Sequence, residues 1–116
     1  AERTKSEFFG DPSDPALVRA TSDAYAKSGY DRGHLAPAAD FRDVSQAAMD
    51  ATFALGTNVA PQSPALNRHY WARIEAWVRA LRRSYYHVWV ATGVLYLPQR
   101  RDADGTYEVR YDVLGD

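Results

Sequence analysis

The feature that most constrains this fold is a long amphipathic pattern between residues 64 and 81. Apolar residues recur there at three- and four-residue spacing, and they are Leu66, Tyr70, Ile74, Trp77, Val78 and Leu81. This spacing predicts an amphipathic helix of about five turns that begins near Pro64. We therefore expect the other elements of the fold to be arranged around this helix.

The segments on either side of the helix favour strands. Residues 53–60 form an apolar run closed by Pro61, and residues 87–92 (HVWVAT) are rich in β-formers. The turn sequence DADG at 102–105 precedes an alternation of Tyr107, Val109, Tyr111 and Val113 with polar residues, which is typical of a half-buried strand. Residues 43–50 predict one or two helical turns with Ser45 as the N-cap. The class is α+β, with an antiparallel sheet and one long helix.

Length and composition limit the domain organisation. A chain of 116 residues forms at most one domain. The last alternating strand stops where the chain stops, and such a strand needs a neighbour, so we expect residues 1–116 to be a single domain that is incomplete at its C-terminus. No apolar run reaches the length of a membrane span. The absence of cysteine excludes disulfides, zinc–thiolate sites and thiol catalysis.

The charge distribution is uneven although the net charge is only −1. A value near zero argues weakly against a nucleic-acid-binding protein, because such domains are usually basic. Between residues 67 and 84, however, one acid (Glu75) stands among five arginines, which are Arg68, Arg73, Arg79, Arg82 and Arg83. Two interpretations stay open for this helix, a solvated surface or a phosphate-binding surface on a neutral protein.

The stretch DRGHLAPAADF, residues 31–41, contains the strongest candidate for chemistry. His34 has a neighbouring cation in Arg32 and a small neighbour in Gly33, which lets backbone or substrate approach. Histidine has the side-chain pKa nearest neutrality and is the commonest general base. A tight turn with solvated charges explains the tetrapeptide equally well. His69 can lie on either face of the helix, and we expect His87 to be structural.

Five ordered motifs extend this candidate over nearly the whole chain. DRGHLAPAADF is followed by SQAAMDATF, NVAPQ, LNRHYWARIEAW and VATGVLYLP. This series closely resembles the DNA/RNA non-specific endonucleases, the ββα-metal or His-Me finger nucleases, and within them the endonuclease G branch. The resemblance runs from about Phe8 to Gly115. It implies the ββα-metal nuclease fold and a phosphodiester-cleaving activity.

The resemblance also implies roles for individual residues. His34 matches the general base that takes a proton from the attacking water, and Arg32 matches the arginine at the scissile phosphate. Asn67 matches the one direct protein ligand of the metal. Glu75 matches the glutamate that orients water at that metal. Eight residues of an ideal helix rotate about 80° beyond two turns, so Asn67 and Glu75 are expected near one edge of the helix.

Further basic residues are expected to contact the substrate. Arg68 and Arg73 on the helix are candidates for phosphate contacts. The family has another basic residue near its N-terminal end, for which Lys5 is the candidate here and Arg3 the alternative. Trp71, Trp77 and Trp89 are expected in the core.

Each site residue also has a structural interpretation. Asn67 suits the N-cap of the long helix, and Glu75 suits an ion pair with Arg79 one turn on. Arg32 suits a salt bridge to Asp31 or Asp40, and Asp31 is expected to hold the turn or Arg32.

The activity that the resemblance implies is metal-dependent, sugar-non-specific cleavage of DNA and RNA. The implied cofactor is Mg²⁺, with Mn²⁺ as the alternative. A single asparagine oxygen suffices for Mg²⁺, which keeps most of its waters. The implied partners are DNA and RNA, and a homodimer. Endonuclease G relatives favour a mitochondrial location, with secreted or periplasmic branches as the alternative. The competing hypothesis is a weakly active or inactive nuclease-like domain that binds nucleic acid or a protein partner.

One departure from the family pattern concerns spacing. Between the threonine that matches Thr52 and the A-P-Q sequence that begins at Ala60, the family usually has one residue fewer than this chain. The extra residue is assigned to Gly56, and an additional glycine in a strand predicts a β-bulge.

Overall fold

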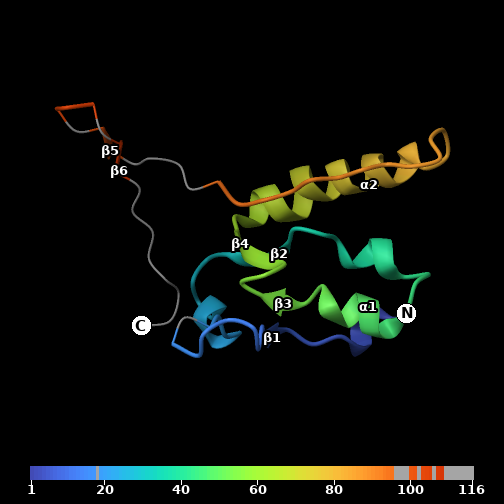
Figure 1. Cartoon of the computed structure of the whole chain (residues 1–116), viewed down its shortest axis with the longest axis horizontal. Coiled ribbons are helices and arrows are strands. Elements are labelled where there is room, and N and C mark those ends of the chain that lie inside the picture. Colours follow the sequence, from blue (N-terminus) through green and yellow to red (C-terminus); the bar gives the residue numbers. More distant parts are fainter. Residues whose placement is uncertain (18, 96–99, 102, 106, 109–116) are drawn as a thin grey trace.

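The computed structural model describes residues 1–17, 19–95, 100–101, 103–105 and 107–108 (Figure 1). Its strands are β1 (Phe9–Gly10), β2 (Asp31–His34), β3 (Ala54–Leu55), β4 (Val59–Gln62), β5 (Arg100–Arg101) and β6 (Tyr107–Glu108). Its α-helices are α1 (Gln46–Ala51) and α2 (Ala72–Leu81), and a π-helical segment, Leu66–Trp71, leads into α2. Short 3₁₀ turns span Arg3–Lys5, Asp23–Tyr25 and Ala38–Phe41.

Four strands form one sheet in the order β1-β3-β4-β2. β2 and β4 pair antiparallel, with Asp31 opposite Gln62 and His34 opposite Val59. β1 runs parallel to β3, so the sheet is mixed rather than antiparallel throughout. The difference arises because no hairpin joins β1 to a neighbour: residues 11–30 carry the chain from β1, at one edge, to β2, at the other. The α+β class is confirmed.

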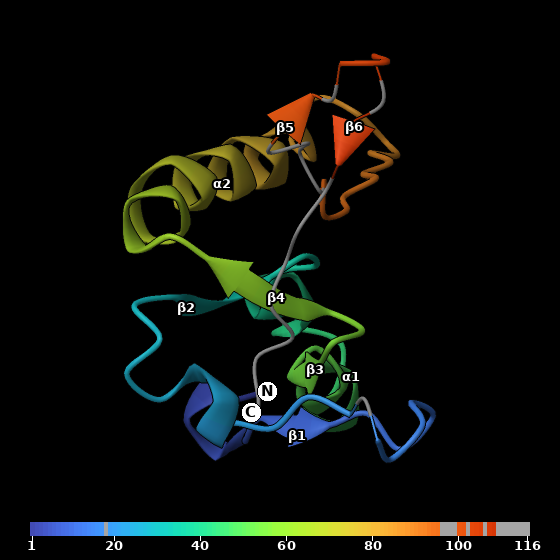
Figure 2. The same cartoon turned by 90° about the vertical axis from the view of Figure 1, so that its left-hand side faces the viewer.

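The layers place the long helix on one side of the sheet. In Figures 1 and 2, α2 lies on one side of β2 and β4, while α1 and β1 lie on the other. Among the contacts that attach the helix to the chain around β2, the Trp71 indole N–H donates to the backbone oxygen of His34 at 3.1 Å, and Arg79 pairs with Asp40 at 2.9 Å. The strand that carries the DRGH tetrapeptide is therefore held against the start of the helix.

The predicted long helix is present, but Asn67 is not its N-cap, which was one of the two interpretations of this residue. The backbone N–H of Leu66 donates to the Ser63 hydroxyl at 3.3 Å, and the Asn67 N–H donates to the Ser63 carbonyl at 2.9 Å. Ser63 therefore caps this helix, and Asn67 lies inside its first turns. The other predicted cap is confirmed, since the Ser45 hydroxyl accepts from the Ala48 N–H at the start of α1.

Two expectations about the C-terminal half are wrong. Residues 87–92 form no strand, and Trp77 and Trp89 are 63% and 91% exposed instead of buried. A β-rich sequence forms a strand only where a neighbouring strand offers its hydrogen bonds, and this run pairs with no other described strand. Trp71 is half-buried, as its bond to β2 requires.

Of the two remaining strand predictions, one falls on residues that the structure describes and the other does not. The hairpin expected around DADG is confirmed by the antiparallel pair β5–β6. The alternating strand beyond it, residues 109–113, lies outside the described residues.

Gly56 lies in the turn between β3 and β4, not within a strand. Its φ is 84°, a left-handed value that glycine adopts without strain. The turn is anchored by Thr57, whose hydroxyl donates to Asp11, and by Asn58, whose amide bonds the backbone of Ala36 and Thr52. The predicted bulge is therefore replaced by a turn that accommodates the additional residue, and β4 keeps its register with β2.

The core packs on both sides of Phe8. Tyr25, Leu55 and Val59 form one cluster, and Ala38, Met49 and Phe53 form a second. Phe8 is partly buried and packs against both clusters. Met49, Leu55 and Val59 are the fully buried side chains of the described residues.

Leu55→Ala is expected to lower the free energy of unfolding by about 2–5 kcal/mol, because Leu55 is fully enclosed and its removal leaves a cavity. Urea unfolding monitored by circular dichroism measures the change. Leu17→Ala is the matched control, since Leu17 is 96% exposed, and its effect is expected within about 0.5 kcal/mol. Equal effects of the two substitutions would contradict the assignment of the core.

Candidate functional site

The alternation of β2 divides the DRGH residues between two sides of the sheet. Arg32 and His34 share one face of the strand, and Phe8 contacts both. The Arg32 guanidinium carbon lies 4.3 Å from the centre of the Phe8 ring, and the His34 ring lies 5.7 Å from it. Gly33 leaves room for the Gln62 side chain, because a Cβ there would lie 2.2 Å from Gln62 as it is placed and would displace it.

His34 is buried in an aromatic environment. It is only 7% exposed and packs edge-on against Phe53, with 4.8 Å between ring centres. Its Nε2 is buried without a hydrogen-bond partner among the described residues. Burial, helped by the charge of Arg3, lowers the pKa of His34 to about 4. The imidazole is therefore neutral at pH 7 and has a lone pair that can accept a proton.

The His34 ring is expected to titrate near pH 4 in the folded protein. The folded-state pKa of about 4 lies below the ordinary 6.5, so between these values the unfolded chain binds a proton that the folded chain does not. The contribution of His34 to stability is therefore complete above pH 6.5 and is lost as the pH falls towards 4. An NMR titration of the ring protons measures the midpoint, and Arg3→Ala is expected to raise it. A midpoint near 6.5 would show that the ring is not enclosed.

Arg32 has no carboxylate partner among the described residues. Its Nη1 donates to the Ser22 hydroxyl at 3.3 Å, and its guanidinium stacks on Phe8. Neither ion pair suggested by the sequence forms, because Asp31 pairs with Arg68 and Asp40 pairs with Arg79. The positive charge of Arg32 is thus oriented by neutral groups and remains free to meet an anion.

Asp31 joins β2 to the π-helical segment. Its carboxylate accepts from the Asn67 Nδ2 at 2.9 Å and from both Nε and Nη2 of Arg68, at 2.7 and 2.6 Å. These bonds, those from Arg68 first, lower the pKa of Asp31 to about 2. Asp31 therefore holds Asn67 and Arg68 rather than Arg32.

The bond to Asp31 fixes the orientation of the Asn67 amide. With the nitrogen engaged, the carbonyl oxygen is the amide atom left for a cation, and an amide oxygen is a ligand that Mg²⁺ accepts. The described residues contain no group of three or more His, Cys, Asp or Glu side chains that would cage an ion. The donors present fit a hydrated Mg²⁺ held through one protein oxygen.

Glu75 is half-buried on α2 and does not pair with Arg79. Burial is the main cause that raises its pKa, and Asp40 adds to this, while Arg79 and Arg3 oppose it. The π-helical segment takes more residues per turn than an α-helix. The rotation about the helix axis between Asn67 and Glu75 is therefore smaller than the offset expected for an ideal α-helix.

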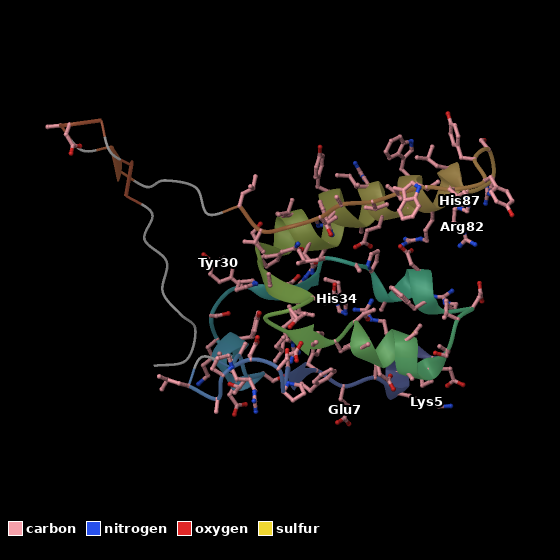
Figure 3. All side chains as sticks on the ribbon, in the orientation of Figure 1. Lys5, Glu7, Tyr30, His34, Arg82 and His87 are labelled. Atoms are coloured by element: carbon pink, nitrogen blue, oxygen red, sulfur yellow. The ribbon has the colours of Figure 1, made fainter. Side chains whose placement is uncertain are left out.

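The basic residues predicted at the substrate differ in their surroundings. Arg68 is engaged by Asp31, and Arg73 is exposed on the long helix. Lys5 is exposed and pairs with Glu2 at 3.0 Å, and Figure 3 shows it at the edge of the molecule, away from His34. Arg3 lies closer to the site: its guanidinium is 5.9 Å from the Phe53 ring, and its charge acts on both His34 and Glu75.

A cavity of about 360 Å³ adjoins the site. Arg32 and Asn67 lie on its wall together with Phe8, Tyr25 and Tyr30. His34 and Glu75 are not on that wall. Nothing in the spacing of the sequence distinguishes Phe8 or Tyr30 as site residues.

The chain is similar in sequence to known proteins of one family. Residues 1–112 match the family described as DNA/RNA non-specific endonuclease. The chain is 51% identical over 114 residues to human "Endonuclease G, mitochondrial", covering 98% of this chain and 37% of that protein. It is 45% identical over 116 residues to the "Mitochondrial nuclease" of Saccharomyces cerevisiae, covering 99% of this chain and 35% of that one.

A solved structure is similar as well. A chain in the crystal structure of the EndoG/EndoGI complex superposes with a TM-score of 0.78 at 38% identity, over 98% of this chain and 46% of that chain. The chain thus spans between a third and a half of the length of these relatives. None of the described helices has the length and apolar character needed to cross a membrane. By sequence and by fold, the chain belongs to the DNA/RNA non-specific endonuclease family.

Proposed function

We propose that this protein is a metal-dependent endonuclease that hydrolyses phosphodiester bonds in both DNA and RNA. The observation that carries the proposal is the junction of β2 with the start of the long helix. Arg32, which has no carboxylate partner among the described residues, shares one face of β2 with the buried, neutral His34 and lines a cavity with the oriented amide of Asn67. A site built to hold phosphate and a cation reads few base edges, so sequence specificity is low.

Several residues of the chain contribute to the hydrolysis, each at a different step. His34 accepts the proton of the attacking water. The water oxygen bonds to phosphorus, the bond from phosphorus to the 3′ oxygen breaks, and that oxygen takes up a proton from solvent. Products with 5′-phosphate and 3′-hydroxyl ends result.

Arg32 holds the scissile phosphate, and its stacking on Phe8 keeps the guanidinium in one orientation before substrate arrives. Arg3 adds a second positive charge near His34, a role for which Lys5 was the first candidate from sequence. Arg73 is a candidate for contact with more distant phosphates. The charge of Arg68 is balanced by Asp31, which also bonds Asn67. This pairing favours a role for Arg68 in holding Asn67 in place.

Asn67 would hold Mg²⁺, or Mn²⁺ in its place, through its amide oxygen, and Glu75 would orient water near it. When bound, the cation supplies positive charge to the phosphate and to the leaving oxygen. Asp31 positions the ligand, and the half-buried carboxylate of Glu75 contributes a hydrogen-bond acceptor.

The natural full-length protein tests this proposal. Supercoiled plasmid and total RNA are each incubated with Mg²⁺ and with EDTA, and both substrates are expected to be cut only with Mg²⁺. Nucleic acid that stays intact in Mg²⁺ while binding to the protein would favour the competing function, a nuclease-like binding domain. A mitochondrial location, which the name of the human "Endonuclease G, mitochondrial" supports, is tested by fluorescence microscopy, and the homodimer expected from the family resemblance is tested by light scattering.

A further inference from the structure

The geometry points to a nucleoside-binding subsite in the cavity beside Arg32, in which one unpaired nucleoside next to the scissile phosphate stacks on Tyr30. This inference rests on the proposed nuclease function and specifies how that site would hold its substrate. It assigns a substrate contact to Tyr30, which lies immediately before the DRGH tetrapeptide.

The position of the cavity determines what can enter it. Arg32 and Asn67 lie on the wall, so a phosphate held by them would place its attached sugar and base at the cavity. The volume of about 360 Å³ lies in the range of small-molecule pockets. The carboxylate of Asp31, also on the wall, is neutralised by Arg68, so the wall does not repel a nucleotide.

The aromatic residues of the wall differ in exposure. Tyr25 is buried in the core with Leu55 and Val59. Tyr30 is 52% exposed, so a large part of its side chain is accessible from outside. Figure 3 shows Tyr30 at the start of β2 and His34 at its other end, so the stacking residue and the base act on different parts of a substrate. An exposed ring beside a phosphate site suits a nucleobase, whose face stacks on tyrosine whatever its identity.

The consequence is a preference for unpaired nucleotides. A base that enters the cavity must leave the stack of its own strand, which costs least in single strands and at mismatches. Stacking on Tyr30 therefore increases affinity for single strands more than for duplexes, while the choice among the four bases stays weak.

Binding is measured in a His34→Ala background, so that cleavage does not interfere, with fluorescein-labelled single-stranded DNA in Mg²⁺. Tyr30→Ala is expected to weaken binding by roughly 5- to 150-fold, the range for loss of one stacked base. Tyr30→Phe is expected to bind within about twofold of the parent because it keeps the ring face. Tyr85→Ala is the matched control, since Tyr85 is 61% exposed and does not line the cavity.

A set of abasic strands identifies the partner of Tyr30. Strands lacking one base, on either side of the preferred cleavage position, are compared with the complete strand. One of the abasic strands is expected to bind the parent protein more weakly than the complete strand does, by the same factor as Tyr30→Ala weakens binding of the complete strand. Removing that base is expected to cause no further loss of affinity in the Tyr30→Ala protein. The subsite would be overturned if removing that base weakened binding to Tyr30→Ala as much as it weakens binding to the parent. It would also be overturned if Tyr30→Ala bound the complete strand as tightly as the parent does. Neither result would affect the nuclease proposal, which fails only if the wild-type protein leaves nucleic acid uncut.

Discussion

His34→Ala is expected to reduce kcat for plasmid cleavage by about 10²- to 10⁴-fold, the range that a positioned general base contributes. The imidazole is neutral at pH 7 because its enclosure between Phe8 and Phe53 disfavours the charged form. No other described histidine is buried, so no second imidazole can replace it. Single-turnover cleavage at pH 7 with saturating Mg²⁺ measures the loss directly.

Two controls separate catalysis from folding. His87→Ala removes an exposed imidazole whose ring contacts are Tyr86 and Trp89, and it is expected to leave the rate unchanged. His34→Gln preserves more of the buried volume, and it is expected to be as inactive as alanine while its circular dichroism matches the wild type. A folded His34 variant that cuts within threefold of the wild-type rate would rule out His34 as the base.

Asn67→Ala is expected to lower the rate by about 100-fold or more and to raise the Mg²⁺ concentration needed for half-maximal activity. The substitution removes the amide oxygen that would bind the ion and leaves Asp31 with Arg68 as its partner. The measurement is a Mg²⁺ titration of cleavage rate for both proteins.

Ser63→Ala is the matched control for this second prediction. It removes the hydroxyl that caps the same helix, at a cost of about 0.5–2 kcal/mol in stability, without touching the amide. Its Mg²⁺ dependence is expected to equal that of the wild type. If Asn67→Ala needed no more Mg²⁺ than the wild type, the ion would have to be held elsewhere.

The sequence predicted the elements that carry the candidate site better than it predicted the surfaces around them. The helical period located Asn67 and Glu75 on one helix, and the cap at Ser45 followed from local hydrogen bonding alone. The same period could not tell that Trp77 is exposed, because an apolar face indicates which side is buried only when a partner covers it. The strand expected at residues 87–92 failed for a related reason, since strand propensity requires a neighbour.

Tertiary contacts decided the remaining assignments. Asp31 binds Asn67, 36 residues away, and the sequence alone left Arg32 as its nearest partner. Arg3 affects His34 through space, and no local pattern separated it from Lys5. The cavity likewise combines Ser22, Tyr30 and Asn67 from separate segments, so no single window of the sequence reveals it.

The π-helical segment Leu66–Trp71 and the turn at Gly56 are two places where the fold accommodates a change in length. Deleting one codon inside the π-helical segment, after Asn67, would favour an ordinary α-helix, in which Asn67 and Glu75 are seven residues apart and about 20° short of two full turns. The two side chains would therefore still face the same side of the helix. The turn at Gly56 likewise absorbs an additional residue without shifting β4 against β2. Single-residue changes in length should therefore survive selection more often at these two places than within α2, where a deletion rotates every later residue by about 100°.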